Sequence, residues 1–274
     1  ILPNLPVKYG VLLIVDRYAV FFMGLLLFAG FTVTVLSFDY MKSQKENKEE
    51  YYMLMFLAIL GASILVSSQH FASLFLGFEL LSVSLYIMIA YMRQRSLSIE
   101  AGAKYLILAA LSSSIILFGM ALIYTSSGMM NFADLAGYFS KVFISTPLIQ
   151  AGLAMIFAGM AFKLALVPFH MWTPDVYQGA PAPVTGFVAT VSKGSVFAIL
   201  FRFYTALDLY SYHFMLAFFI ILAIASMFTG NILALLQNNV KRILAYSSIA
   251  HLGYLLISFI AGDELGREAA GFYL

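Results

Sequence analysis

Apolar stretches of about twenty residues follow one another along the chain, separated by short segments that hold most of the charged residues. Because an α-helix rises about 1.5 Å per residue, each stretch is long enough to cross the hydrocarbon core of a bilayer. The pattern predicts eight membrane-spanning helices, at roughly 18–37, 51–68, 70–91, 103–126, 147–167, 184–204, 212–235 and 243–261. The expected fold class is therefore all-α, a polytopic membrane helical bundle.

The composition supports this assignment and excludes several other classes. Of the 274 residues, 62% are hydrophobic and 10% are charged, whereas soluble domains carry about a quarter charged residues. The net charge of +2 gives no electrostatic footprint for nucleic acid, so no nucleic-acid partner is expected. Without cysteine the chain cannot hold a cysteine-ligated iron–sulfur cluster, and no histidine or carboxylate spacing indicates a metal site.

The distribution of basic residues predicts an orientation. The loops after the first, third and seventh predicted helices carry seven lysines and arginines, and the opposite side carries five. The positive-inside rule places the loop that holds Lys42 and Lys48 in the cytoplasm. The first helix would then run from outside to inside.

The segment 168–183 contains four of the seven prolines in the sequence. Proline removes a backbone donor and clashes with the preceding helical turn, which favours a broken helix or a re-entrant piece. We expect a discontinuous helix near Lys163 to Pro183, with backbone carbonyls left free near Lys163 to hold waters or its ammonium. The alternative is an ordinary interfacial loop in which Trp172 and Tyr177 are belt residues.

Several ionisable residues fall inside the predicted helices, where a charge costs at least roughly 2.5–3.5 kcal/mol without a partner. They are Glu79, Lys104, Lys163, Lys193, Arg202 and His251. Arg202 lies near a helix end and is expected to reach the interface as an anchor.

Lysines exceed acids among these interior groups, and this excess indicates proton transfer rather than simple pairing. One glutamate cannot neutralise three lysines, and a buried lysine loses its proton more readily than an exposed one. A structural ion pair between Glu79 and Lys104 is the alternative, and we expect their side chains to face each other across one helical hairpin. His251 either joins the relay or packs as an ordinary histidine. Interior serines are left without a role, because serine is common in membrane helix packing.

Three stretches carry a resemblance to a known family. They are Phe162–Pro181 (FKLALVPFHMWTPDVYQGAP), Ser73–Leu80 (SLFLGFEL) and Lys241–Tyr254 (KRILAYSSIAHLGY). The first closely resembles the antiporter-like subunit N of proton-pumping NADH:quinone oxidoreductase, respiratory complex I, and the other two agree with it.

The resemblance implies a fold and a set of partners. The sequence would be one membrane domain over 1–274 and a fragment of a longer subunit, with a first inverted repeat at 51–204 and the start of a second repeat at 212–274. The family's midplane lysine of the second repeat would lie beyond Leu274. The partners would be the lipid bilayer of the bacterial inner membrane and the other membrane subunits of complex I, with quinone handled elsewhere. No cofactor and no redox centre are expected in this chain.

The resemblance also implies residue roles. Glu79 would modulate the charge of the neighbouring lysines, Lys163 would be the central proton carrier, and Lys193 would pass charge onward. Lys104 would be an additional lysine able to pair with the glutamate. Lys241 and His251 match positions that lead toward the second half of the subunit.

Two other functions remain open at this point. A subunit of a multi-subunit sodium/proton antiporter would share the fold and the buried lysines, although the sequence of Trp172–Tyr177 favours complex I. A purely structural membrane subunit would use the same charges only to hold helices together.

Overall fold

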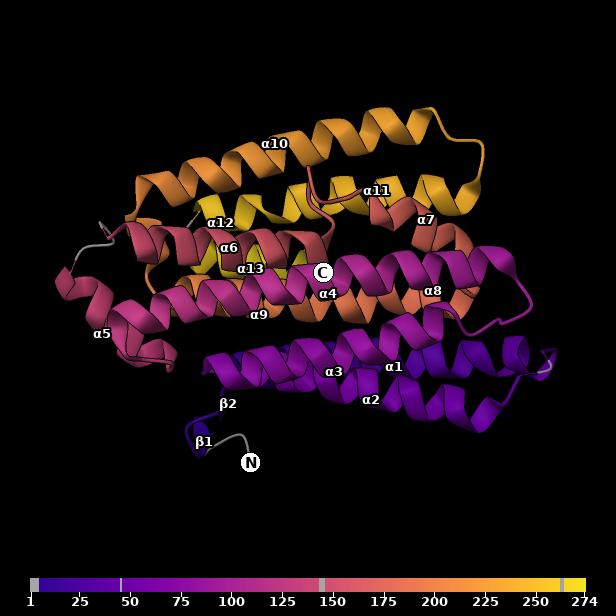
Figure 1. Cartoon of the computed structure of the whole chain (residues 1–274), viewed down its shortest axis with the longest axis horizontal. Helices are drawn as coiled ribbons and strands as arrows, with labels where there is room; N and C mark the ends of the chain where they lie inside the picture. The colour runs from indigo at the N-terminus through magenta and orange to yellow at the C-terminus, as the bar shows by residue number, and fades with distance from the viewer. Residues whose placement is uncertain (1–4, 45, 143–145, 262–263) are drawn as a thin grey trace.

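Long helices run side by side in the computed structural model, which describes residues 5–44, 46–142, 146–261 and 264–274 (Figure 1). Within these ranges, eight helical segments are long and apolar enough to cross a membrane. They are α1 (Arg17–Lys42), α2 (Lys48–Ser67), α3 (Phe71–Ile89), α4 (Ser96–Ser127), α6 (Pro147–Leu164), the segment Ala182–Ala206, α10 (His213–Leu235) and the segment Val240–Ala261. The expected multi-pass membrane bundle is confirmed.

The spanning segments are longer at several ends than hydropathy predicts. Helix α4 begins at Ser96 rather than near 103, because its first two turns are helical but contain Ser96, Ser98 and Glu100, which interrupt the apolar run. The segment Ala182–Ala206 consists of α8 (Ala182–Phe187), a π-helical turn η3 (Val188–Ser192) and α9 (Lys193–Ala206). The last segment divides into α11 (Val240–Leu255) and α12 (Ile257–Ala261).

Short elements that a search for long apolar runs does not detect complete the fold. An antiparallel hairpin pairs β1 (Val7–Tyr9) with β2 (Leu13–Val15) in a register that places Val7 opposite Val15. The remaining elements are α5 (Phe132–Val142), α7 (Trp172–Gly179), the 3₁₀ turn η4 (Leu209–Ser211) and α13 (Glu264–Tyr273). Helix α5 turns Phe132, Leu135 and Phe139 inward, so its apolar face covers one end of the bundle.

Small residues let the helices approach closely. A Cβ atom added at Gly119 of α4 would lie 2.6 Å from the Gly152 carbonyl oxygen of α6, and one added at Gly152 would lie 2.7 Å from the Gly119 carbonyl. Such contacts replace the hydrophobic effect as the driving force for helix association inside a membrane. Outer faces are apolar, with Phe28 of α1 and Phe228 of α10 largely exposed, as expected for helices that contact lipid.

The proline-rich segment breaks the bundle's regular helices twice. Helix α6 ends at Leu164, where Ala165 adopts a left-handed conformation with φ of 61°, and α7 begins at Trp172. A second interruption at Ala180 separates α7 from α8. The predicted discontinuous helix is therefore confirmed. The interfacial-loop alternative is wrong, because Trp172 and Tyr177 are buried within the bundle instead of lying in an interfacial belt.

Candidate functional site

Lys163 lies in the last turn of α6, at the first helix break, and only 5% of its surface is exposed. Its Nζ donates a hydrogen bond of 2.6 Å to Ser82 Oγ of α3. The Ser82 hydroxyl in turn donates to the Phe78 carbonyl at 2.7 Å. The ammonium is therefore held by a neutral hydroxyl rather than by a carboxylate or by the carbonyls of its own broken helix.

The broken end of α6 is closed by side chains from elsewhere. The Trp172 indole donates to the Phe162 carbonyl at 2.9 Å, and Ser226 Oγ of α10 accepts from the Val167 amide at 3.0 Å. Backbone groups of a helix end need such partners inside a membrane. Sequence reasoning expected free carbonyls here, and it missed the indole that takes one of them.

Glu79 precedes Ser82 by three residues on α3, so the two side chains lie on one face of that helix. Its Oε1 atom is buried and has no hydrogen-bond partner in the part of the chain that the structure describes. Glu79 acts electrostatically on Lys163 and on Tyr105 of α4. The fold thus brings the predicted acid and the predicted central lysine into one site.

Lys193 is the first residue of α9 and follows directly on the π-helical turn η3. It is 2% exposed, and its Nζ donates to Ser248 Oγ of α11 at 2.7 Å. The same atom lies 5.3 Å from the centre of the Tyr177 ring, whose hydroxyl donates to Ser248 at 3.2 Å. π-Helical turns occur frequently at functional sites, but no periodicity in the sequence indicated this one.

His251 shares a cavity with Lys193. The cavity has a volume of about 410 Å³ and is lined by Lys193, Ser248, His251 and Tyr273 together with apolar side chains. His251 Nδ1 lies 2.6 Å from the Tyr273 hydroxyl. The structure therefore brings these two predicted residues to one cavity.

Lys104 does not occupy its expected place. Its Nζ pairs with Glu100 at 2.7 Å and with Asp175 of α7 at 2.8 Å, and its side chain is 45% exposed. The prediction that Lys104 faces Glu79 is wrong, because two carboxylates nearer the end of the bundle compete for this ammonium. One of them, Glu100, lies a single turn away on the same helix.

Asp175 joins α7 to two other helices. It accepts from Lys104 of α4 and from Arg242 of α11, both at 2.8 Å. Burial alone would raise the pKa of the Asp175 carboxyl, but the hydrogen bonds and charges of Lys104 and Arg242 outweigh it and hold this pKa below its ordinary value. Beside this cluster, Lys241 Nζ donates to the Ala180 carbonyl at 2.7 Å, at the second break.

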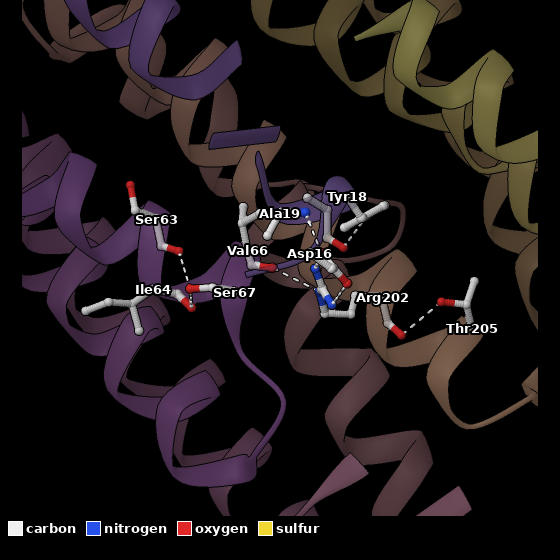
Figure 2. A network of polar contacts seen from close by, with 10 residues as sticks. Asp16, Tyr18, Ala19, Ser63, Ile64, Val66, Ser67, Arg202 and Thr205 are labelled. Carbon is white, nitrogen blue, oxygen red and sulfur yellow. Dashed lines mark hydrogen bonds and ion pairs between the residues drawn. The ribbon is translucent and has the colours of Figure 1, made fainter. Parts of the chain in front are cut away.

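Arg202 forms a network at the opposite end of the bundle (Figure 2). Its guanidinium donates to both oxygens of Asp16, at 2.7 and 2.9 Å, and to the Val66 carbonyl at 2.9 Å. It also lies 4.8 Å from the centre of the Tyr18 ring. Arg202 is therefore turned inward to join α1, α2 and α9, and the expected interfacial anchor is wrong.

Comparison with known proteins places these residues in a family context. Residues 68–274 match the family model described as NADH:quinone oxidoreductase/Mrp antiporter, TM. NADH-quinone oxidoreductase subunit N of Ectopseudomonas mendocina is 46% identical over 98% of this chain and 55% of that protein. The protein of the same name from Methylococcus capsulatus is 48% identical over the same shares. The chain thus spans about half the length of the curated relatives that it matches.

Solved structures give the same picture. A chain of respiratory complex I from Thermus thermophilus with bound aureothin is 33% identical, with a TM-score of 0.80 over 98% of this chain and 56% of that one. A chain of an archaeal membrane-bound sulfane sulfur reductase is 31% identical, with a TM-score of 0.79 over 90% and 50%. A chain of the Mrp complex from Dietzia shares the fold alone, with 22% identity and a TM-score of 0.85 over 95% and 48%.

Proposed function

Because the chain belongs to the NADH:quinone oxidoreductase/Mrp antiporter transmembrane family, we propose that it translocates protons as part of subunit N of an NADH:quinone oxidoreductase. The names of the two bacterial relatives at 46% and 48% identity support this choice within the family. In this proposal the chain lies in a bacterial inner membrane among the other membrane subunits of the complex. NADH oxidation and quinone reduction are assigned to other subunits.

The observation that carries the proposal is the kind of partner that the buried lysines have. Lys163 and Lys193 each donate to a serine hydroxyl, and the four salt bridges among the described residues involve neither of them. A lysine that only holds helices together inside a membrane is expected to pair with a carboxylate or with backbone carbonyls, which offset its charge. A hydroxyl partner leaves the ammonium free to lose its proton, which supports a carrier over a purely structural role.

The roles follow from the positions. Lys163 takes up and releases the proton, and Glu79 is the buried acid that modulates its charge. Lys193 passes charge toward the cavity that it shares with His251. Lys241, at the second break, belongs to the same proposed path. Lys104 is not retained as the partner of Glu79, because Asp175 and Glu100 bind it.

Substitution of Lys163 tests the proposal in the full complex reconstituted into liposomes. Lys163→Ala removes the proton carrier, and Lys163→Arg keeps a charge that hardly releases a proton, so both variants should lose most proton translocation per assembled complex. Lys141→Ala, at an exposed lysine of α5, is the control and should pump normally. Near-normal pumping by Lys163→Ala would eliminate the carrier role. If Lys163→Arg keeps proton pumping and Lys163→Ala loses it, a structural ion pair is favoured.

The sodium/proton antiporter alternative is separated by ion dependence. The likeness to the Mrp complex at 22% identity supports the shared fold and does not favour that activity. We expect NADH-driven proton uptake into the liposomes to be the same with and without sodium. Sodium movement coupled to proton movement would favour the antiporter instead.

A further inference from the structure

Helix α3 carries two polar side chains, Ser82 and Glu79, on one face, and Ser82 binds the Lys163 ammonium. Ser82 Oγ accepts from Lys163 Nζ at 2.6 Å, whereas Glu79 Oε1, three residues earlier on the same face, is buried and has no partner among the described residues. The stronger acceptor is therefore empty while the weaker one is occupied. We propose that Ser82 is a positioning residue that holds the Lys163 ammonium apart from Glu79. The inference rests on the proposed role of Lys163 as the proton carrier.

The geometry of Ser82 makes it a fixed acceptor. Its hydroxyl proton is given to the Phe78 carbonyl, which leaves the oxygen lone pairs directed at Lys163. Both side chains are 5% exposed, so water does not compete easily for either group. An ammonium that binds a neutral hydroxyl loses its proton more readily than one paired with a carboxylate. When the Lys163 ammonium binds Ser82, it can therefore release its proton. When it binds Glu79, it retains the proton, and we call this the retaining position.

The charged surroundings of Lys163 are simple. Glu79 of α3 is the charged group that acts on it among the described residues, and Tyr105 of α4 is the titratable neighbour of Glu79. On α9, Lys193 is directed to Ser248 and Tyr177 instead. When the Ser82 hydroxyl is removed, the polar partner left for the ammonium on α3 is therefore Glu79.

The test compares Ser82→Ala with Ser84→Ala in the full reconstituted complex. Ser84 is a buried serine on the same helix, and its hydroxyl donates to the Leu80 carbonyl. In Ser82→Ala, the Lys163–Glu79 pair should retain its proton, so the pH profile of pumping should move to higher pH by about one unit and pumping at neutral pH should fall roughly tenfold. Ser84→Ala should keep the original profile. An unchanged profile or a shift to lower pH in Ser82→Ala overturns the proposal.

Conservative variants separate acceptor chemistry from packing. Ser82→Thr keeps the hydroxyl and should therefore show the original pH profile of pumping. A shift of this profile as large as that of Ser82→Ala overturns the proposal. If Ser82→Ala does not assemble, Ser82→Cys offers a weaker acceptor and should give a smaller shift in the same direction. An unshifted Cys variant also counts against Ser82.

A double substitution distinguishes this inference from the proposed function. With Glu79→Gln in place, the retaining position is lost, so adding Ser82→Ala should produce no further alkaline shift. A full additive shift in the double variant overturns the competition between the two acceptors. Normal pumping by Lys163→Ala refutes the proposed function itself. Loss of pumping in Lys163→Ala together with wild-type behaviour of Ser82→Ala refutes only the inference about Ser82.

Discussion

At the residue scale, the buried cations differ by the chemistry of their partners. Lys163 and Lys193 bind hydroxyls, while Arg202 binds the Asp16 carboxylate through two parallel hydrogen bonds. A guanidinium stays protonated in proteins and matches a carboxylate in shape, whereas a lysine exchanges its proton when its surroundings allow. In the proposed function, the permanent charge of Arg202 therefore serves a structural contact, and the two exchangeable lysines lie beside a helix break at Lys163 and beside the π-helical turn at Lys193.

Removal of the Arg202 guanidinium should destabilise the bundle without stopping proton transfer by the molecules that assemble. Arg202→Ala removes the guanidinium from the Asp16 carboxylate and from the Val66 carbonyl, while Asp16 keeps its hydrogen bond from the Ala19 amide. We expect a loss of about 2 kcal/mol, below the range for a fully buried pair because Asp16 is 29% exposed. A lower midpoint of thermal unfolding of the purified complex checks this. Arg93→Ala, at an exposed arginine, should leave that midpoint unchanged.

The identities of the candidate residues were predictable, but their partners were not. Glu79, Lys163 and Lys193 stand out in the sequence because a charge inside an apolar stretch is costly wherever it points. Ser82 lies 81 positions from Lys163, and Ser248 lies 55 from Lys193, so only the packing of helices joins them. Serine is common in membrane helices, which is why neither residue could be distinguished from a packing serine.

At the element scale, α7 is the helix whose position depends most on ion pairs with other helices. It is a short helix between two breaks, and Asp175 ties it to α4 and α11 while Trp172 ties it to the end of α6. The proline cluster predicted the breaks, since proline excludes continuous helical hydrogen bonding. It could not predict the docking of α7, because the ion pairs that hold this helix join residues 71 and 67 positions apart.

Acid should loosen α7 through Asp175. The pKa of its carboxyl is lower in the folded protein than in the unfolded chain, because Lys104 and Arg242 stabilise the charged form against the effect of burial. This contribution to stability is fully present above the ordinary carboxyl pKa of about 3.9 and is lost as the pH falls through the lower folded value. Hydrogen exchange at the α7 amides should therefore increase in that acidic range.

A variant that cannot titrate provides the control for this prediction. Asp175→Asn removes the carboxylate, so the α7 amides should exchange hydrogen faster at neutral pH. In this variant, the increase in exchange that protonation of Asp175 causes at acidic pH should be absent. Equal exchange in α7 of both proteins at neutral pH would show that the cluster does not hold this helix.

At the scale of the whole molecule, the connections fall at two opposite ends of the bundle. The α1–α2, α3–α4 and α10–α11 connections lie together at the right of Figure 1, and the hairpin and α5 lie at the left. Hydropathy was sufficient to predict the eight spans, and three sequence stretches were sufficient to indicate the family, which the match over residues 68–274 confirms. The division into inverted repeats at 51–204 and 212–274 stays a prediction.

Orientation can be measured by labelling, since the 274 residues contain no cysteine. The positive-inside rule predicts that the end with the α3–α4 connection faces the cytoplasm. A membrane-impermeant thiol reagent should then label Gln94→Cys in inverted inner-membrane vesicles. It should not label this residue in intact cells whose outer membrane has been permeabilised. Ser211→Cys, exposed at the opposite end, should show the reverse pattern. The opposite result for both positions would invert the predicted topology.

The π-helical turn η3 has a consequence for how the chain length between Ala182 and Ala206 can vary. A π-helical turn accommodates one residue more than an α-helical turn, and each residue of an α-helix turns the chain by about 100°. Deletion of one residue within Val188–Ser192 would give a regular helix of the same apolar character. Because the wide turn absorbs the extra residue, this deletion would leave Lys193 pointing in nearly its present direction relative to α8, whereas a deletion within the regular part of α8 would rotate the residues before it by about 100° relative to Lys193. In this segment, the effect of losing one residue therefore depends on whether the residue lies inside η3 or in the flanking α-helix, although mean hydropathy would hardly change in either case.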